Sequence, residues 1–479
     1  MAYPKMVQHW INNQIATSTT GQFYDKLNPA TGASLAQVTR GGAVDVALAV
    51  QAALAATKQW QETSIMQRAE LLRAVAQLIQ QRSAEIAEIV NLETGKSIVD
   101  ATGEAKAAME MGFFVAGEGR RYYGKTTTSS MPHRTAMIVR QPIGVCGLII
   151  AANTPLPNVA WKAFPALLCG NTVVLKPSED IPYTAIWFAE LLKEVGIPAG
   201  VFNVVQGFGT EVGVPLVADE RVKLISFTGS VPVGKQINKI AGERLAKVCL
   251  ELGGKNPFVV CDDADLEAAA DFAVQSAFSN AGQRCAAGSR IIVFASVYDK
   301  FKTLFLEQAK RYSTGPVINE KQLNNMAAAV ERAVEAGATL LLGGKRLTDS
   351  EHVSGFYYAP TILEGAKPTD AISCAELFGP ITVLYQVNNF QEALDLANST
   401  EFALTAAVHT SSIHRSQEFQ DKCVAGVISV NGPSHGSEPH LPFGGEKNSG
   451  TGWREAGTEA LDVYSDWKTV YIKHNPSHV

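Results

Sequence analysis

Residues 145–180, VCGLIIAANTPLPNVAWKAFPALLCGNTVVLKPSED, decide the fold. The apolar run at 145–151 predicts a strand, residues 157–168 predict a helix, and residues 172–175 predict a second apolar strand. Two apolar strands on either side of a helix are typical of the β-α-β unit, in which both strands run parallel. This stretch therefore predicts a parallel sheet that is covered by helices.

The same alternation extends to residue 250 and begins again after residue 251. Before it, residues 43–119 carry Ala, Leu, Glu and Gln at helical spacing. We therefore predict two doubly wound α/β units, preceded by a helical segment. The helices are predicted at 43–60, 66–93, 100–118, 183–195, 212–217, 233–241, 266–279, 297–309 and 320–336, and the further strands at 202–205, 222–226, 246–250, 258–260, 290–294, 339–342 and 427–430.

Two segments stand apart from this alternation. Residues 124–134 and 466–472 are predicted to form strands or ribbons that project from the main sheets. Unpaired strand edges commonly pair with another chain, so these segments indicate contact with a second subunit.

The composition is that of a globular enzyme. Apolar residues make up 46% and charged residues 18% of the 479 residues, and the net charge of −5 gives no reason to expect nucleic acid. The N-terminus lacks a secretory pattern and the apolar runs are too short to span a bilayer, so we expect a cytoplasmic protein without a membrane segment. The seven cysteines contain no C-x-x-C pair, which favours reduced thiols, and no histidine pattern predicts a metal.

Two short motifs predict covalent chemistry at a carbonyl. Glu251 follows a predicted strand and precedes Gly253 and Gly254, and Cys285 follows Gly282-Gln-Arg. A thiolate attacks carbonyl carbon, and a carboxylate beside it can activate the water that releases a thioester. Taken alone, Cys285 is better explained as a buried structural cysteine, and Glu251 is explained equally well as an N-cap or surface carboxylate.

Other turns are suited to a nucleotide. The sequence from Gly229 to Gly234 follows a strand and opens a helix, so its free N–H groups can hold a pyrophosphate. The glycines around Phe208 match the dinucleotide fingerprint only weakly. Lys176 and Glu179 end a strand and could bind the hydroxyls of a ribose, and the carboxylate there favours NAD over NADP.

With these residues assembled, the chain closely resembles the aldehyde dehydrogenase superfamily over essentially its whole length. The interval between Glu251 and Cys285 also suits that family. The resemblance rests on ordered motifs, which are Asn28-Pro-Ala-Thr-Gly32, Asn153, Gly170-Asn-Thr-Val-Val-Leu-Lys-Pro-Ser-Glu179, Phe227-Thr-Gly-Ser230, Glu251-Leu-Gly-Gly-Lys255, Gly282-Gln-Arg-Cys285, Glu376-Leu-Phe-Gly-Pro380 and Pro442-Phe-Gly-Gly445.

The resemblance implies a role for each matching residue. Cys285 resembles the nucleophile, Asn153 with the Cys285 N–H would form the oxyanion hole, and Glu251 would activate water. The expected reaction is oxidation of an aldehyde to a carboxylic acid with NAD, through a thiohemiacetal and a thioester. The residues expected at the cofactor are Lys176, Ser178, Glu179, Gly209, Phe227, Gly229, Ser230, Leu252, Glu376 and Phe378.

The resemblance also implies an architecture. It places an NAD-binding domain at 1–122 and 143–250, a catalytic domain at 251–462, and oligomerisation segments at 123–142 and 463–479 of a homodimer or homotetramer. The chain departs from the family pattern at Ala151-Ala152, where an indole is usual, and at Trp453, which is inserted before Arg454-Glu455.

The sequence leaves the aldehyde open, with aromatic, aliphatic and semialdehyde substrates as alternatives. A CoA-acylating dehydrogenase and a catalytically silent binding protein are the competing functions. Glu251 counts against the first, and retention of Cys285, Glu251 and Asn153 against the second. The residues expected at the substrate are Met109, Phe113, Phe114, Asn158, Trp161, Arg284 and the loop 433–440, with His435 and His440.

Overall fold

The first α/β unit is built on a seven-stranded sheet. In this computed structural model, which describes residues 3–475, its strand order is β12-β11-β8-β9-β10-β2-β3. The first five of these strands run parallel, and β2 joins β10 in the antiparallel sense. The strands are β8 (Val145–Ile149), β9 (Thr172–Lys176), β10 (Phe202–Val204), β11 (Val222–Thr228), β12 (Lys247–Glu251), β2 (His9–Ile11) and β3 (Gln14–Ala16).

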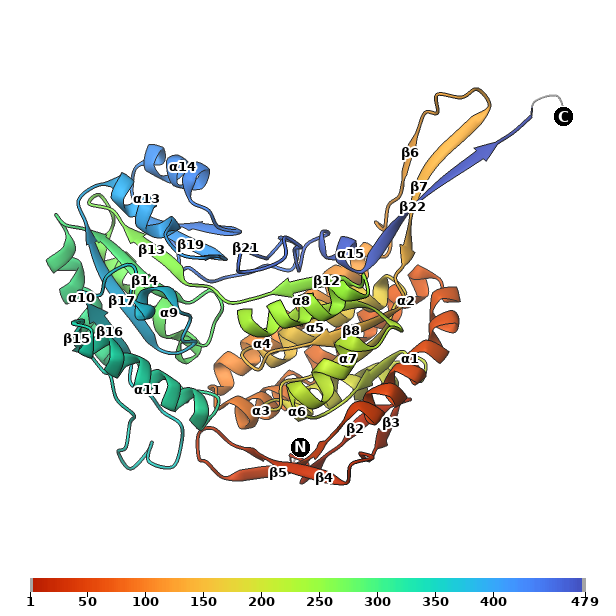
Figure 1. Cartoon of the computed structure of the whole chain (residues 1–479), viewed down its shortest axis with the longest axis horizontal. Coiled ribbons are helices and arrows are strands. Elements are labelled where there is room, and N and C mark those ends of the chain that lie inside the picture. Colours follow the sequence, from red (N-terminus) through yellow and green to blue (C-terminus); the bar gives the residue numbers. More distant parts are fainter. Residues whose placement is uncertain (1–2, 476–479) are drawn as a thin grey trace.

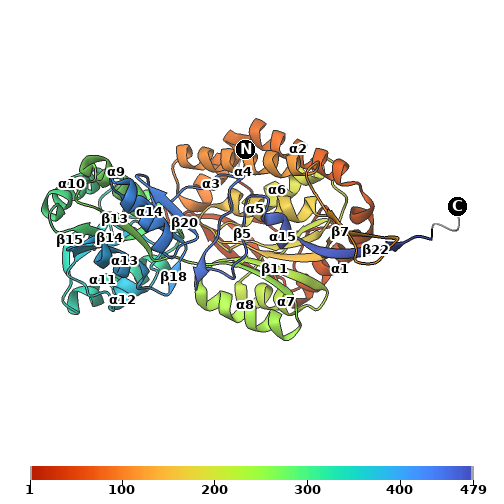
Figure 2. The same cartoon turned by 90° about the horizontal axis from the view of Figure 1, so that it is seen from above.

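Helices cover both faces of this sheet, as Figure 2 shows. The apolar side chains of its strands divide between two cores, one under α2 to α6 and one under α1, α7 and α8. The helix predicted at 66–93 is two helices, because the chain bends at Arg82. The helices are α1 (Ala43–Glu62), α2 (Ile65–Gln81), α3 (Ser83–Thr94), α4 (Ile98–Glu118), α5 (Pro155–Leu168), α6 (Pro182–Glu194), α7 (Val214–Ala218), which follows a π-turn at Gly209–Gly213, and α8 (Val231–Glu243).

A second seven-stranded sheet has the order β15-β16-β17-β14-β13-β19-β20. It is parallel except at β15, which pairs with β16 in the antiparallel sense. Alternate residues of β13 face different cores: Phe258 and Val260 lie under α9 and α10, and Val259 lies with α11, α13 and α14. The strands are β13 (Asn256–Val260), β14 (Gly288–Phe294), β15 (Thr339–Leu342), β16 (Thr361–Glu364), β17 (Ile381–Val387), β19 (Thr405–His409) and β20 (Val427–Val430).

The strands β16, β17 and β19 were not predicted, although the predicted β13, β14, β15 and β20 are present. The remaining elements of this unit are α9 (Leu266–Phe278), a 3-10 turn at Ser279–Gly282, α10 (Tyr298–Arg311), α11 (Glu320–Glu335), α12 (Ala371–Cys374), α13 (Phe390–Asn398), α14 (Ile413–Lys422) and the small sheet of β18 (Phe402–Ala403) with β21 (Glu446–Lys447).

A three-stranded ribbon projects from the body, as predicted (Figure 1). It consists of β6 (Lys125–Thr127), β7 (Arg134–Pro142) and β22 (Ser465–Lys473), and β22 follows β7 along its whole length. Before β22, α15 (Ala460–Val463) packs its Leu461 into the first core, so the chain returns to the first unit before residue 462.

The N-terminal region adds a second three-stranded sheet to the first unit. It is formed by β1 (Met6–Val7), β5 (Ser34–Arg40) and β4 (Gln22–Leu27), which the sequence pattern did not predict. Within residues 3–475, none of the helices has the length and apolar character needed to cross a membrane.

A buried carboxylate holds the first turn of α6 beside the loop that follows β9. Glu93, which is 0% exposed, accepts hydrogen bonds from the N–H groups of Tyr183 (2.7 Å) and Thr184 (3.3 Å). The hydroxyls of Thr184 and Tyr3 also donate to it, at 2.5 and 2.8 Å. These N–H groups have no partner within the helix, and a negative charge is favourable at that end of the helix dipole.

We therefore expect Glu93→Ala to lower the free energy of unfolding by about 3 kcal/mol, because several buried donors lose their acceptor. Glu93→Gln keeps an acceptor oxygen and should retain most of the stability. Urea denaturation measures both, with Glu62→Ala on the exposed face of α1 as the control. Equal effects of the alanine and glutamine variants would contradict this role.

Candidate active site

The first sheet reverses its strand order between β8 and β11. From β8 the sheet continues through β9 and β10 on one side, and through β11 and β12 on the other. Ligands of open α/β sheets bind outside the carboxyl ends of the strands at such a switch point. Asn153 follows β8, and Gly229 and Ser230 follow β11, so these predicted residues meet at that point.

The second sheet meets the first with the opposite ends of its strands. Cys285 comes shortly before β14, and Asn256 begins β13, so the amino ends of these strands face the switch point. A cavity of about 640 Å³ lies between the two units. Its lining includes the predicted residues Asn153, Asn158, Trp161, Gly229, Ser230, Glu251, Leu252, Arg284, Cys285, Glu376, Phe378 and His435.

A left-handed turn carries Cys285 into the cavity. Asn280, Ala281 and Gly282 have φ angles of 54°, 52° and 67°. A Cβ at Gly282 would overlap the carbonyl of Gly379, so only glycine fits at this position. Strain of this kind in Asn280 and Ala281 persists where the surrounding structure enforces it, which is common at functional sites.

The backbone of Cys285 is held by Asn256. The Asn256 Nδ2 donates to the carbonyls of Cys285 (2.7 Å) and Ala287 (2.9 Å), and its Oδ1 accepts from the Thr405 N–H (3.0 Å). Burial raises the pKa of the Cys285 thiol to about 12, with further increases from Glu376 and Glu251 and a decrease from Arg284. The thiol is therefore protonated at neutral pH until a base removes its proton.

Glu251 is a buried carboxylate at the end of β12. Its carbonyl accepts from the Gly229 N–H at 3.1 Å, while the next residue, Leu252, donates to the Ser449 carbonyl at 2.9 Å. Both carboxylate oxygens are buried and have no hydrogen-bond partner within residues 3–475. Burial, and then the nearby Glu455, raise its pKa well above the usual value. Such a group is suited to accept a proton from a ligand or a water in the cavity.

A buried ion pair lies behind Glu251. The Lys162 ammonium is 0% exposed, contacts the Glu455 carboxylate, and donates to the Ser226 hydroxyl at 2.9 Å. Because Glu455 already has this cation as its partner, Glu251 is left as the unpaired base.

Asn153 is held through its backbone by both units. Its carbonyl accepts from the Lys96 ammonium and from the Asn280 Nδ2, the latter at 3.1 Å. Lys96 is also ion-paired with Glu104 on α4, which compensates for the burial of the ammonium. The loop of Cys285 and the loop of Asn153 are thus tied together through Asn280.

The residues predicted at the nucleotide form two groups. Lys176 ends β9, is 3% exposed, and donates to Glu179, whose side chain is 41% exposed, at 3.3 Å. At the start of α8, Ser230 occupies the N-cap position without a side-chain hydrogen bond to the helix. Since α8 has no side-chain cap there, its first-turn N–H groups are suited to receive an anion. A Cβ at Gly234 would lie 2.6 Å from Leu252, which therefore packs closely on α8.

Glu376 and Phe378 approach the cavity from the second unit. The Glu376 carboxylate accepts from the Gly254 N–H at 3.1 Å and lies directly over Gly253, where any side chain would overlap it. Burial raises the pKa of Glu376 to about 7. Phe378 has a φ of 54°, so it belongs to a second strained turn at the same cavity.

Some predicted residues lie away from the cavity lining. Lys176, Ser178, Glu179, Gly209 and Phe227 are outside it, near the carboxyl ends of the first sheet. Met109 and Phe114 pack against the first core, and His440 is an exposed residue 3.7 Å from Glu438. Phe113 is half-buried and also absent from the lining.

Other cavity residues were not predicted from the sequence. They include Lys96, Asp100, Glu104, Asn280, Phe443 and Glu455. Lys96, Asp100 and Glu104 form a pattern of a lysine followed by two acids at helical spacing. Charged side chains are common near the ends of helices, so this pattern by itself did not indicate a functional site.

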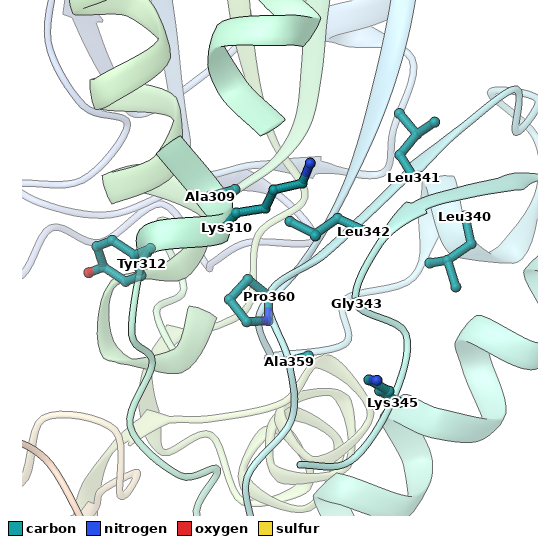
Figure 3. Close-up of a pocket in the computed structure, with 10 residues that line it drawn as sticks. All are labelled: Ala309, Lys310, Tyr312, Leu340, Leu341, Leu342, Gly343, Lys345, Ala359 and Pro360. Carbon is teal, nitrogen blue, oxygen red and sulfur yellow. The ribbon is translucent and has the colours of Figure 1, made fainter. Parts of the chain in front are cut away.

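A separate hollow of about 520 Å³ lies at the edge of the second sheet, between the end of α10 and β15 (Figure 3). Its polar side chains come from Lys310, Tyr312 and Lys345, and the rest of its lining is largely apolar. The residues that line this hollow include no nucleophile paired with a base, so the cavity at Cys285 is the candidate active site.

A half-exposed thiol, an unpaired carboxylate and an amide that converge between two α/β units define an enzyme of covalent carbonyl chemistry. The chain belongs to the aldehyde dehydrogenase family, whose sequence model matches residues 15–470. The predicted family and its fold of two α/β units are therefore confirmed.

Individual relatives match over nearly the full length. The chain is 37% identical to an alpha-ketoglutaric semialdehyde dehydrogenase of Bacillus subtilis, over 97% of this chain and 98% of that one. It is 36% identical to a betaine aldehyde dehydrogenase of the same organism, with 98% of each covered. A solved betaine aldehyde dehydrogenase of Staphylococcus aureus in complex with NAD+ superposes with a TM-score of 0.96 at 33% identity, over 98% of this chain and 95% of that one.

Proposed function

We propose that this protein oxidises an aldehyde to the carboxylic acid with NAD, using Cys285 as nucleophile, Glu251 as general base and Asn153 in the oxyanion hole. The observation that carries the proposal is the unpaired, buried Glu251 carboxylate in the same cavity as the Cys285 thiol and Asn153. The family membership and the NAD+ complex of the similar structure support the same reaction.

The nucleotide positions fit NAD. Lys176 and Glu179 would hold the hydroxyls of the adenine-side ribose, while Ser230 and the uncapped start of α8 would hold the pyrophosphate. Glu376 and Phe378 would face the nicotinamide-side ribose. The exposed Glu179 carboxylate would repel a 2′-phosphate, which favours NAD over NADP. Ser178, Gly209, Phe227, Gly229 and Leu252 complete the proposed contacts.

The reaction begins with loss of the Cys285 proton. Glu251 accepts this proton, because it is the buried base without a partner in the described part of the cavity. The Cys285 sulfur then bonds to the aldehyde carbon, and the carbonyl electrons move to the oxygen. The Asn153 amide and the Cys285 N–H donate to that oxyanion in the thiohemiacetal.

The second half of the reaction releases the acid. Bound NAD supplies the acceptor for the hydride that leaves the thiohemiacetal carbon. Cys285 then holds the acyl group as a thioester. Glu251, after releasing the first proton to solvent, removes a proton from a water, the water oxygen bonds to the acyl carbon, and Cys285 departs as thiolate. A general base of this kind favours hydrolysis over transfer to CoA.

We expect Cys285→Ala to abolish NADH formation, because no thiohemiacetal can form. Glu251→Gln should slow both thiohemiacetal formation and thioester hydrolysis, because the proposed base acts in both steps, and should lower turnover by about 10²–10⁴-fold. Rapid-mixing absorbance measures both. Cys374→Ala, at the other half-exposed cysteine, is the control and should keep full activity. Steady turnover by the Cys285→Ala enzyme would refute the proposal.

The Arg284 guanidinium at the cavity favours an aldehyde that carries a carboxylate. The Arg284 Nε donates to the Ser279 hydroxyl at 3.1 Å, and within residues 3–475 the guanidinium has no ion-pair partner. The acids of α4 at the cavity, in contrast, have partners: Glu104 pairs with Lys96, Glu110 lies 3.8 Å from the Lys106 ammonium, and Asp100 accepts from the Ser97 hydroxyl at 2.7 Å. Arg284 is therefore the charged side chain that is free to bind an anion.

A free guanidinium at Arg284 would distinguish between the substrates named for the relatives. An alpha-ketoglutaric semialdehyde carries a carboxylate, whereas betaine aldehyde carries a cation that Arg284 would repel. Burial and then Arg284 lower the pKa of His435 to about 4, so this neighbouring residue is neutral and does not add a second positive charge. We therefore propose a semialdehyde as the substrate.

We expect kcat/KM to be highest for carboxylate-bearing aldehydes, lower for neutral aldehydes of similar length, and lowest for betaine aldehyde. Arg284→Leu should lower kcat/KM for succinic semialdehyde by about 10–100-fold, since a charge-assisted hydrogen bond is lost. The same variant should change the value for hexanal by less than about twofold. Initial-rate kinetics decide this, and an equal loss on both substrates would exclude a carboxylate at Arg284.

We further propose that residues 1–122 with 143–250 bind the nucleotide, that 251–462 carry the nucleophile, and that the ribbon joins copies of this chain in a homo-oligomer. On β22, Trp467 and Tyr471 are 44% and 60% exposed. The Arg140 and Arg134 guanidinium groups lie 4.0 and 4.4 Å from their ring centres. Exposed aromatic and arginine side chains of this kind are enriched at interfaces between proteins.

We expect the double variant Trp467→Ser and Tyr471→Ser to dissociate the assembly, because two large side chains leave the interface. Light scattering should give a monomer mass for the variant and a multiple of it for the native protein. Lys58→Ser, on the exposed face of α1, is the control. A native protein that is already monomeric would rule out the oligomer.

A further inference from the structure

The oxyanion hole requires one orientation of the Asn153 side chain. A primary amide has a donor end, Nδ2, and an acceptor end, Oδ1, and its last torsion has two nearly equivalent positions. Only the donor end stabilises a developing oxyanion, and the acceptor end would repel it. The backbone of Asn153 is held by Lys96 and Asn280, so the orientation of its amide is the freedom that remains.

Asn158, one turn along α5, is in contact with this amide. Its Nδ2 lies 3.1 Å from the Ala151 carbonyl oxygen and 3.1 Å from the Asn153 Oδ1. A backbone carbonyl can only accept, so it selects the nitrogen end of Asn158 on that side. Because the Asn158 Nδ2 also lies against the Asn153 amide, the atom of Asn153 that faces it must be the acceptor. Oδ1 therefore faces Asn158, and the Asn153 Nδ2 is left available to the cavity that both residues line.

We infer that Asn158 is a positioning residue that sets the Asn153 amide with its donor end available to the oxyanion. This inference rests on the proposed function of the site. Both hydrogens of the Asn158 amide are used, one by the Ala151 carbonyl and one by Asn153. Asn158 therefore acts through Asn153 and has no amide hydrogen left to donate to a substrate.

Two substitutions of Asn158 distinguish an effect on the orientation of the Asn153 amide from an effect on packing. Aspartate has the shape of asparagine but presents only acceptors when ionised, so Asn158→Asp would draw the Asn153 Nδ2 toward itself and present Oδ1 to the substrate. Leucine has a similar size without polar atoms, so Asn158→Leu would leave the amide without a preferred orientation. The aspartate variant should therefore be the more severe of the two.

The test is a double-mutant cycle with Asn153→Ala. Removal of one oxyanion donor costs about 10²–10³ in kcat, so we expect Asn153→Ala to fall in that range. Asn158→Asp should lower kcat by about 10²-fold and Asn158→Leu by about fivefold, with the KM for NAD unchanged. In the Asn153→Ala background both changes should alter kcat by less than about twofold, because the residue they act through is absent.

The double variants are the matched controls, since they carry the same changes in charge and shape. A loss of kcat from Asn158→Asp that is as large in the Asn153→Ala background would overturn the inference while leaving the proposed function intact. If the aspartate variant does not fold, as judged by its melting temperature, the leucine cycle gives the decision by the same criterion. A native enzyme that forms no NADH with any aldehyde would overturn the proposed function itself, and this inference with it.

Discussion

The short crossover between the two sheets is the constraint on which the site depends. β12 ends at Glu251 and β13 begins at Asn256, so residues 252–255 carry the chain from one sheet to the other. The carboxyl edge of the first sheet must therefore meet the amino edge of the second. Side chains at Gly253 and Gly254 would overlap Glu376 and the Cys285 carbonyl, so glycine is required for this close approach. One strand end thus brings Glu251, the loop of Cys285 and the Glu376 carboxylate together.

The ionisable side chains at this junction lie in surroundings that disfavour their charged forms, which lowers the stability of the fold. Glu251 is buried without a partner, and burial raises the pKa of both Glu251 and Cys285. Other buried charges near the cavity are ion-paired, as with Lys162 against Glu455 and Lys96 against Glu104. The contrast is physical evidence for function, since an unpaired buried carboxylate is unfavourable unless a ligand or water uses it.

Much of the fold could be predicted from the sequence, because the local spacing of apolar residues indicates which positions are buried. The apolar strands of residues 145–180 and the helices between them follow from periodicity alone, and the motifs at Glu251 and Cys285 carry their chemistry in their residue types. The strands β1 to β5 were missed, and so was the break at Arg82 within a continuous helical pattern. Short polar strands at a sheet edge have little periodicity, so their pairing partners and not their own residues stabilise them.

The sequence by itself determined the family, the α/β alternation, and the residue types that we propose as nucleophile, base and oxyanion donor. Only the tertiary structure decided which charges are paired. Lys96 pairs with Glu104, whereas Arg284 has no ion-pair partner among residues 3–475. His435 lines the cavity, and His440 lies outside it. The tertiary structure also brings Asn158 to the amide of Asn153. The physical reason is that hydrogen bonds and ion pairs act over a few ångströms, between groups whose proximity depends on the packing of the whole chain.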